Sequence, residues 1–252
     1  MLGGEQHSGS EDGALREKII ALAHRVVTSN LFQDVMHVLH ARRPLLCARL
    51  LRMGYLDQRA RKQARAIFCR HAALPVDHPD ARRVERLLSI DRRNTRRMKR
   101  IIARHGWPAQ SDVGPKAARA AWLLVHHADH DHMFQRACLA HLRAAVGRGE
   151  ASPRSLAYLT DKVLVAEGRP QIYGTQVFDT RQLDVLYRLS GKELMDAMGR
   201  LYSGSSSQPL QPLPIEDEAN VDHRRAEVGL PPMRVYIAQI NRRVTTEHAG
   251  LE

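Results

Sequence analysis

A turn rich in histidine and aspartate is the stretch of this sequence best suited to chemistry. Residues 122–132 read WLLVHHADHDH, which places six ionisable side chains where an apolar helix would otherwise continue. Charge at such a position costs free energy unless it is paired, bound to a metal or used in a reaction. The turn therefore predicts a functional site, but its composition does not name the reaction.

Two kinds of chemistry fit this turn. If the helix continues, His127 and Asp131 lie one turn apart, as do other histidine and aspartate pairs, and that spacing can hold a metal ion together with a ligand from another segment. The candidate metal ligands are then His127, His130 and Asp131. Without a metal, His127 beside a carboxylate such as Asp129 could act as a general acid or base, because histidine exchanges protons near neutral pH. The sequence leaves both alternatives open.

A carboxylate and an arginine lie one turn apart in the segment 53–68, MGYLDQRARKQARAIF. Its predicted buried stripe contains Leu56, Ala60 and Ala64, and Asp57 flanks that stripe, so Asp57 and Arg61 can form an i,i+4 ion pair. An exposed pair of this kind contributes only a few tenths of a kcal/mol. A solvated pair is the favoured interpretation, and a site role for both residues is the alternative.

Polar residues interrupt the apolar side of the next helix, which we predict from Pro79 to about Arg104. Extending its apolar stripe through a gap of two turns places Asp91 and Asn94 on the buried side. Buried polar side chains need hydrogen-bonding partners. The two residues are therefore candidates for a binding site or for a structural polar network.

A further polar group follows residue 152. The predicted helix 152–168 is apolar on most sides, but Tyr158 and Asp161 share one of its faces. The next segment, 169–176, reads RPQIYGTQ and contains too much glycine and proline for a helix. We expect an ordered loop whose polar side chains offer hydrogen bonds, namely Gln171, Tyr173, Thr175 and Gln176.

Length and cysteine content indicate a protein that folds without covalent staples. A chain of 252 residues can bury a substantial core. Its three cysteines are an odd number without CxxC pairing, which favours free thiols in a reducing compartment. The N-terminus has no apolar core of a signal sequence, and no segment is apolar for long enough to span a bilayer, so we expect a cytoplasmic protein without a membrane partner.

The net charge of +12 favours an acidic partner such as nucleic acid. However, arginine outnumbers lysine 33 to 6, which is typical of a GC-rich genome, and only 5% of residues are aromatic. Nucleic-acid binders usually offer aromatic side chains for stacking or a recognisable module. Nucleic acid is therefore possible but less favoured than a small-molecule substrate.

The periodicity along the chain predicts a mainly α-helical fold. We expect a disordered leader at 1–13, a helical domain at 14–202, a Ser/Pro linker or loop at 203–214 and C-terminal helices at 215–252 that pack back on the domain and fray at the tail. Within the helical domain, helices are expected at 14–27, about 31–39 and 181–201. The fold class is a single-domain irregular helical bundle with an ordered QIYGTQ loop and little or no sheet.

Several short peptides, in this order and spacing, resemble the domain-of-unknown-function family numbered 6624. They are DQRAR (57–61), DRRN (91–94), HGWP (105–108), HHADHD (126–131), AYLTD (157–161), GRPQIYGTQ (168–176) and VDHRRAEVGLPP (221–232). The resemblance covers roughly 45–178 and 212–236. The family usually carries Gln where His126 stands, which indicates a specialised member.

The resemblance implies that a set of polar positions recurs, although no activity comes with it. The set adds Gln58, Gln135, Asp222 and Arg225 to the residues already identified. Together they lead us to expect an enzyme of the hydrolase or transferase class that acts on a small polar or anionic metabolite in specialised metabolism, with or without a divalent metal. Expected roles are His127 as acid or base and Asp129 as the residue that orients it.

Further roles complete this hypothesis. Asp57 and Tyr173 are additional catalytic candidates, and Arg61 would bind a negative group of the substrate. The remaining candidate binding residues are Gln58, Asp91, Asn94, Tyr158, Asp161, Gln171, Thr175, Gln176 and Arg225. No nucleotide, flavin or haem motif is visible. The alternative is a non-catalytic binding or adaptor module whose basic surface meets RNA or an acidic carrier protein.

Overall fold

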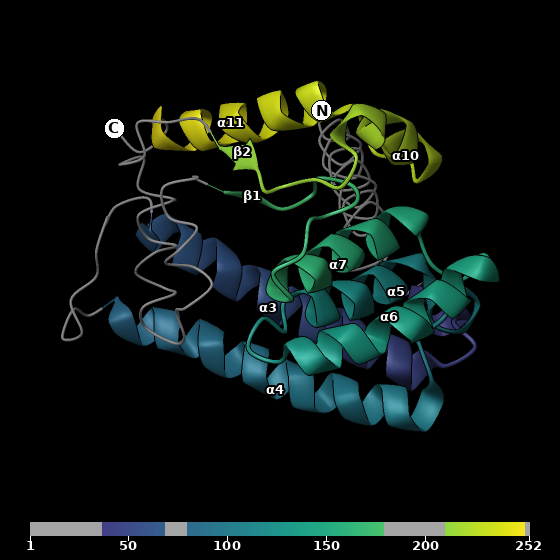
Figure 1. The fold of residues 1–252 in the computed structure, drawn as a ribbon. Helices are drawn as coiled ribbons and strands as arrows, with labels where there is room; N and C mark the ends of the chain where they lie inside the picture. Colours follow the sequence, from purple (N-terminus) through teal and green to yellow (C-terminus); the bar gives the residue numbers. More distant parts are fainter. Residues whose placement is uncertain (1–36, 69–79, 179–209, 250–252) are drawn as a thin grey trace, which may run out of the picture.

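Helix α5 (Gln110–His126) lies at the centre of the helical bundle (Figure 1). It contacts α3 (Pro44–Phe68), α4 (Ala81–His105), α6 (His132–Gly147) and α7 (Pro153–Ala166). Small and branched side chains on α5, among them Ala117, Ala121 and Val125, are buried between these neighbours. A helix that is apolar on all sides must be enclosed in this way, and residues 120–125 of α5 are all apolar.

The computed structural model describes residues 37–68, 80–178 and 210–249. Several predicted features lie outside these ranges. They are the leader 1–13, the helix 14–27, most of the helix 31–39, the helix 181–201 and the first part of the linker 203–214.

Close helix packing sets the position of α3 against α5. A Cβ atom at Gly54 would lie 2.9 Å from the Cβ of Ala120, so the two helices approach each other more closely than a larger side chain would allow. The shared core continues through Cys47 and Leu50 of α3, Met98 and Ile101 of α4, and residues of α5 and α6. This packing fixes the side of α3 that faces the end of α5.

Glycine and proline separate the helices. Gly106 follows α4 with a φ of 70°, in the left-handed region that glycine tolerates best. Gly114, with a φ of 78°, interrupts α5, and Pro115 restarts it. Gly106 therefore follows the end of α4, and Pro115 opens the second part of α5, after the short helical stretch 110–113.

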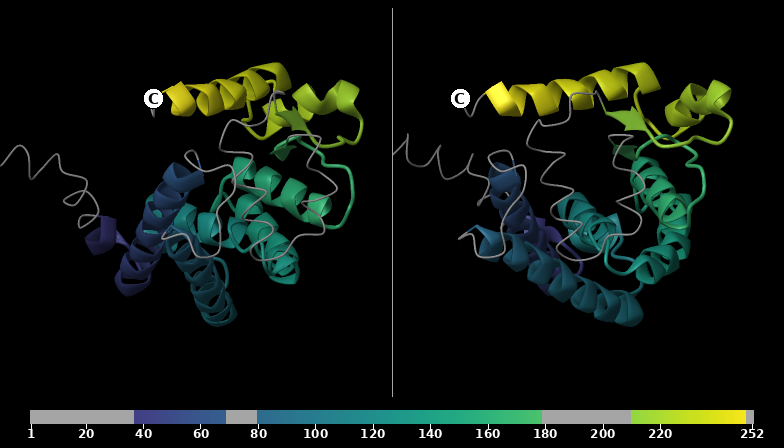
Figure 2. Two further views of the ribbon diagram at one scale, coloured as in Figure 1. Left: turned by 90° about the vertical axis from the view of Figure 1, so that its left-hand side faces the viewer. Right: turned by 60° about the vertical axis from the view of Figure 1, so that its left-hand side comes forward.

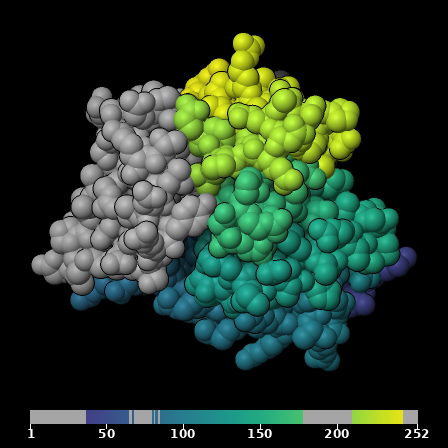
Figure 3. Space-filling view, in the orientation of Figure 1, coloured from purple at the N-terminus to yellow at the C-terminus, as the bar shows by residue number. Residues whose placement is uncertain are grey.

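The C-terminal part of the chain lies on the 169–178 loop. Strand β1 (Val177–Phe178) pairs antiparallel with β2 (Gln211–Pro212), and an isolated parallel bridge joins Gln171 to Ile215. The short helix η2 (Glu218–Asn220) and helices α10 (Val221–Glu227) and α11 (Met233–Ala249) follow. Figures 2 and 3 show this part above α7. Residues 210–214, predicted as linker, thus form ordered contacts.

The chain is a mainly α-helical single domain with one two-stranded ladder among the described residues, as its periodicity predicts. None of the helices in the described ranges is both long and apolar enough to cross a membrane.

Candidate functional site

Asp57 lies on the buried side of α3, with 0% of its surface exposed. Its Oδ2 atom is 2.9 Å from His127 Nδ1 and accepts a hydrogen bond of 2.8 Å from Gln58 Nε2. The interpretation of Asp57 as half of a solvated ion pair is therefore wrong. The exposed residue is Leu56, at 41%, so the buried stripe runs through Asp57 and not through Leu56.

Arg61 connects Asp57, Asp91 and His127. Its Nη2 donates to Asp91 Oδ1 at 2.8 Å, and its Nε lies 2.8 Å from His127 Nδ1 and 3.4 Å from Asp57 Oδ1. One guanidinium from α3 therefore joins a carboxylate of α4 to a histidine at the end of α5. We call Asp57, Arg61, Asp91 and His127 the acid–base cluster.

The proton on His127 follows from the charges around Nδ1. Burial raises the pKa of Asp57, but the hydrogen bond with His127 and the charge of Arg61 act against it, and the pKa lies below its usual value. Burial lowers the pKa of His127, against the effect of Asp57. Nδ1 faces both the Asp57 carboxylate, which can only accept, and the Nε–H of Arg61, which can only donate. The two pKa directions correspond to an anionic carboxylate and a neutral imidazole, and we assign the single ring proton to Nδ1, where Asp57 Oδ2 accepts it. With this tautomer, the Nε of Arg61 keeps Asp57 Oδ1, 3.4 Å away, as its ionic partner.

The other nitrogen of His127 therefore carries the lone pair. Nε2 makes no hydrogen bond among the described residues, and it is not one of the buried polar atoms that lack a partner. A neutral histidine with its Nδ1 fixed and its Nε2 unbonded can take a proton from a bound molecule.

Asp91 is the second group of the cluster that can exchange protons near neutral pH. Burial, together with the negative charges of Asp57 and Asp129, raises the pKa of Asp91 to about 7 against the opposing charge of Arg61. Its hydrogen bond from Arg61 uses Oδ1 only. The neighbouring Asn94 is also buried, as predicted for both residues, and its Nδ2 has no hydrogen-bonding partner.

Asp129 contacts Lys162 and Gln135. Its Oδ1 lies 2.7 Å from Lys162 Nζ and accepts from Gln135 Nε2 at 3.2 Å. Burial raises the pKa of Asp129, but the charge and hydrogen bond of Lys162 hold it well below its usual value. The residue that orients His127 is therefore Asp57, and the orienting role expected for Asp129 is wrong.

The turn between α5 and α6 has a different shape from the one the metal hypothesis required. Helix α5 ends at His126, Asp131 caps α6 by accepting from Phe134 N at 3.1 Å, and Asp131 also pairs with Lys99 at 2.5 Å. His130 is exposed. Because the helix does not continue, His127 contacts Asp57 and Arg61, whereas Asp131 contacts Lys99 and Phe134. These candidate ligands and the exposed His130 do not converge. Across the described ranges, no group of three or more His, Cys, Asp or Glu could hold a metal ion.

Gln135 holds this turn in place. It is fully buried, and its Nε2 donates to the carbonyl oxygens of Val125 and His126 at 3.2 and 3.0 Å as well as to Asp129. These carbonyls belong to the last turn of α5, and that of Val125 also accepts from Ala128 N at 3.1 Å. Gln135 thus positions the backbone that carries His127.

His126 faces an aromatic group. Its ring stacks on Trp122 at 5.3 Å and meets the edge of Tyr158 at 6.3 Å, while its Nδ1 is buried without a partner. Burial and the charge of Lys162 place the pKa of His126 well below its usual value, so the ring is neutral. Tyr158, a predicted binding residue, also packs edge-on against Tyr236.

Asp161 binds backbone amides. Its Oδ1 accepts from Ile172 N at 2.8 Å and Tyr173 N at 3.0 Å, and its Oδ2 accepts from Thr175 N at 2.8 Å. Burial raises the pKa of Asp161 although these hydrogen bonds act in the opposite direction. The predicted binding residue Asp161 therefore fixes the 169–178 loop.

The polar side chains of the loop serve the same purpose. Gln171 donates to the carbonyls of Gln176 and Leu213 and accepts from Gln176 N, and Gln176 Nε2 donates to Thr175 Oγ1. Their partners lie within the loop or in the β2 segment. In the structure, Gln171, Thr175 and Gln176 therefore anchor the loop.

Arg225 is also an anchor. It is fully buried, donates to the carbonyl of Tyr173 at 2.5 Å and to that of Pro231 at 2.7 Å, and lies 4.6 Å from the centre of the Tyr236 ring. Tyr236 in turn donates to the carbonyl of Thr175 at 2.9 Å. The structure brings Tyr173 and Arg225 together at this anchor, and among the described residues no hydrogen bond or ion pair joins either of them to the acid–base cluster.

Sequence reasoning missed two residues beside the predicted ones. Lys162, the partner of Asp129, lies one turn from Tyr158 on α7, and that spacing is the signal that could have identified it. Tyr236 gave no signal, because one tyrosine in an amphipathic helix is ordinarily a core residue.

Comparison with known proteins gives one result. No curated protein and no solved structure matches the chain. A family described as a family of unknown function, DUF6624, matches residues 44–190, which is more than half of the chain and includes the acid–base cluster, Lys162 and Asp161. The chain belongs to the DUF6624 family.

Proposed function

We propose that this protein is an enzyme in which His127 acts as a general base on a small polar molecule. The observation that carries the proposal is the contact of 2.9 Å between His127 Nδ1 and the fully buried Asp57, which leaves Nε2 unbonded. Histidines that act as bases in enzymes are commonly held in one tautomer by such a carboxylate.

Asp57 contributes in two ways. It holds the imidazole with the proton on Nδ1, and its charge stabilises the imidazolium that forms when Nε2 accepts a proton. Arg61 has the opposite effect on the imidazolium, because its Nε lies 2.8 Å from Nδ1. The balance keeps His127 neutral before the reaction, which is the form a base requires.

Asp91 supplies the complementary acid. With a pKa of about 7, part of the population carries a proton at neutral pH. In a hydrolysis or group transfer, His127 would remove a proton from water or from a hydroxyl nucleophile, and protonated Asp91 would donate one to the leaving group. The two carboxylates differ in their environments: Asp57 is ionised, whereas the pKa of Asp91 lies near 7. This difference supports the division of roles.

The charges of the cluster favour a polar substrate over a strongly anionic one. Arg61 already contacts Asp57 and Asp91, and Lys162 contacts Asp129. The cations that could attract an anion are therefore largely neutralised. We assign the reacting group of the substrate to a hydroxyl, amide or ester class.

The test is a search for turnover that depends on His127. Purified wild-type protein and His127→Gln would be incubated with a bacterial metabolite extract, and the compounds consumed or formed would be followed by mass spectrometry. We expect wild-type protein to convert at least one compound and His127→Gln to lose this activity at least about a hundredfold. His141→Gln, an exposed histidine of α6, is the matched control.

A second readout separates catalysis from folding. Activity of the wild type should fall at acid pH, where His127 gains a proton, and at alkaline pH, where Asp91 loses one. Equal turnover by wild type and His127→Gln would contradict the proposal, and so would the absence of any converted compound from extracts of several growth conditions.

A cluster of arginines favours a second candidate function, the binding of a polyanion such as RNA. Burial and the charges of Arg93, Arg49, Arg52 and Arg100 lower the pKa of Arg97, so arginines of α3 and α4 lie close together. Such clusters attract phosphate backbones. The acid–base geometry remains better supported, because an arginine-rich helix face is commonly only solvated.

Salt dependence tests this second candidate. If the surface binds RNA, affinity for a single-stranded oligonucleotide should fall steeply with salt, and the double variant Arg93→Gln/Arg97→Gln should weaken binding and reduce the slope. Unchanged affinity in that variant would exclude this face.

A further inference from the structure

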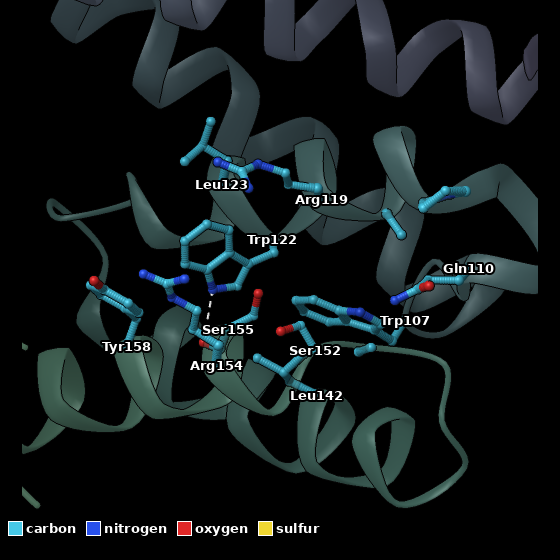
Figure 4. A pocket seen from close by; sticks show the side chains of 13 residues that line it. Trp107, Gln110, Arg119, Trp122, Leu123, Leu142, Ser152, Arg154, Ser155 and Tyr158 are labelled. Carbon is cyan, nitrogen blue, oxygen red and sulfur yellow. Dashed lines mark hydrogen bonds between the residues drawn. The ribbon is translucent and has the colours of Figure 1, made fainter. Parts of the chain in front are cut away.

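A pocket of about 500 Å³ lies between α5, α7 and the segment that precedes α5 (Figure 4). Trp107 and Trp122 line it, together with Ser152, Arg154 and Ser155 at the start of α7 and Arg119 of α5. Binding sites for small molecules commonly have volumes of about 300–1,000 Å³. The pocket is large enough for a nucleotide-sized molecule.

The charge of this pocket is positive and uncompensated. Among the described residues that line it, none is acidic, and two are arginines. Arg119 and Arg154 are both exposed, and neither has a hydrogen bond or ion pair to any residue in the described ranges. This differs from Arg61 and Lys162, whose partners are carboxylates. Two free guanidinium groups at one pocket can bind a phosphate or carboxylate with charge-assisted hydrogen bonds.

The second property of the pocket is a fixed aromatic surface. Trp122 donates from Nε1 to the carbonyl of Ser155 at 2.9 Å, which fixes the ring against α7 (Figure 4). His126 stacks on Trp122 but does not line the pocket, so the pocket meets a part of the indole that His126 leaves uncovered. A fixed indole binds planar rings by stacking, at about 1–3 kcal/mol for a nucleobase.

We infer that this pocket binds a nucleoside monophosphate, with its base against Trp122 and its phosphate near Arg119 and Arg154. Both features are needed for this ligand class, because a free phosphate would not use the indole and an uncharged ring would not use the arginines. Ser152, whose hydroxyl makes no capping hydrogen bond to α7, offers a further donor.

The pocket is separate from the acid–base cluster. Trp122 and Tyr158 stand between them, since both line the pocket and both contact His126. The inference does not depend on the reaction proposed for His127, because it concerns binding alone. A bound nucleotide would press on Trp122 and, through it, on the residue that precedes His127.

Tryptophan fluorescence tests the inference directly. The chain contains two tryptophans, and both line this pocket, so their emission reports on its occupancy. The full-length protein would be titrated with AMP, GMP, CMP and UMP, with excitation at the red edge of the tryptophan band. Adenosine and inorganic phosphate are the matched ligands that each lack one feature.

We expect saturable binding of at least one nucleotide with a dissociation constant below about 1 mM, and binding at least about tenfold weaker for adenosine and for phosphate. Arg154→Gln and Arg119→Gln should each weaken nucleotide binding about tenfold or more. Arg104→Gln, an exposed arginine of α4 outside the pocket, is the matched control and should bind as the wild type does.

Three results would overturn the inference. They are the absence of saturation with all four nucleotides, equal affinity for adenosine and AMP, and equal affinity of the wild type and both pocket variants. Circular dichroism of each variant establishes that it is folded. Since the readout is binding, turnover by the acid–base cluster can be present or absent without changing the result.

Discussion

Replacing Asp91 by Asn should change how the stability of the protein depends on pH. Asp91 lies in the acid–base cluster with only 12% of its side chain exposed, and it accepts a hydrogen bond of 2.8 Å from Arg61. Asn keeps an oxygen for that hydrogen bond but cannot ionise. The substitution therefore removes one titration from the folded state and changes little of its packing.

The magnitude follows from the pKa of Asp91 in the two states. Burial raises the pKa from 3.8 to about 7 on folding. A carboxyl whose folded pKa is raised stabilises the protein fully below its unfolded pKa, and this contribution is lost as pH rises through the folded pKa. A difference of about 3 pH units at about 1.4 kcal/mol per unit gives roughly 4 kcal/mol as the upper limit.

Histidines titrate in the same window with the opposite sign. Burial lowers the folded pKa values of His126 and His127, so their contribution to stability grows as pH rises toward 6.5 and is constant above it. In the wild type, the change of the free energy of unfolding with pH therefore combines opposing contributions from Asp91 and from these histidines. The informative quantity is the free energy of unfolding of Asp91→Asn minus that of the wild type. We expect this difference to rise by up to roughly 4 kcal/mol between about pH 4 and pH 8.

Urea unfolding followed by far-UV circular dichroism, at pH steps across this window, measures that difference. Asp57→Asn is the comparison variant, because folding shifts the pKa of Asp57 in the direction opposite to that of Asp91. Its folded pKa is lowered, so Asp57 stabilises the wild type above the unfolded pKa and this advantage shrinks only below about pH 4. If the Asp91→Asn difference is flat from pH 4 to pH 8, Asp91 is an ordinary carboxylate and its proposed role as an acid fails.

Three further predictions concern residues around the cluster. Asp161→Asn should destabilise the protein by about 1–3 kcal/mol and speed hydrogen exchange in the 169–178 loop, because an amide oxygen cannot replace both carboxylate oxygens on three backbone amides. Gly174→Ala should lower the thermal midpoint more than Gly149→Ala does, since both glycines have a positive φ but only at Gly174 would a Cβ lie 2.6 Å from Met233; equal losses would contradict the packing. His126→Phe should leave stability at pH 7 unchanged within about 1 kcal/mol and increase it relative to the wild type at pH 5, because burial lowers the histidine pKa and its Nδ1 has no partner; a large loss at pH 7 would show a contact that the structure lacks.

The sequence predicted the helices well and the burial of charges less well. On α4 the gap in the apolar stripe correctly placed Asp91 and Asn94 inside, because apolar residues on both sides of the gap, at helical spacing, define one face. On α3 the same reasoning failed for Asp57, which was placed beside the stripe. Leu56 and Asp57 are neighbours, so a rotation of one residue about the helix axis exchanges them, and hydrophobicity favoured the leucine. Only the arginine and histidine that meet Asp57 in three dimensions reveal its burial.

The partner of His127 was predicted incorrectly for a similar reason. Asp129 is two residues away in the sequence, and it would face His127 only if the chain continued in a suitable conformation. The chain turns at His127 instead, because Asp131 caps the next helix and Gln135 binds the last carbonyls of α5. Contacts between distant segments, here α3 with the end of α5, follow from packing at positions such as Gly54, and a periodic pattern in one helix contains no information about them.

The hydrogen-bonding partners of each polar residue distinguish residues that position the chain from residues that can transfer protons. Asp161, Gln171 and Arg225 bond to backbone amides and carbonyls, whose protonation does not change in the physiological range, so these side chains can only hold the chain in place. Asp57, Arg61, Asp91 and His127 bond to one another, and two of the four can change protonation near neutral pH. Proton transfer requires partners whose affinity for a proton is adjustable and similar to that of the substrate. The acid–base cluster meets this requirement and the loop anchors do not, which is why we place the reaction at the end of α5 and assign the QIYGTQ loop to support.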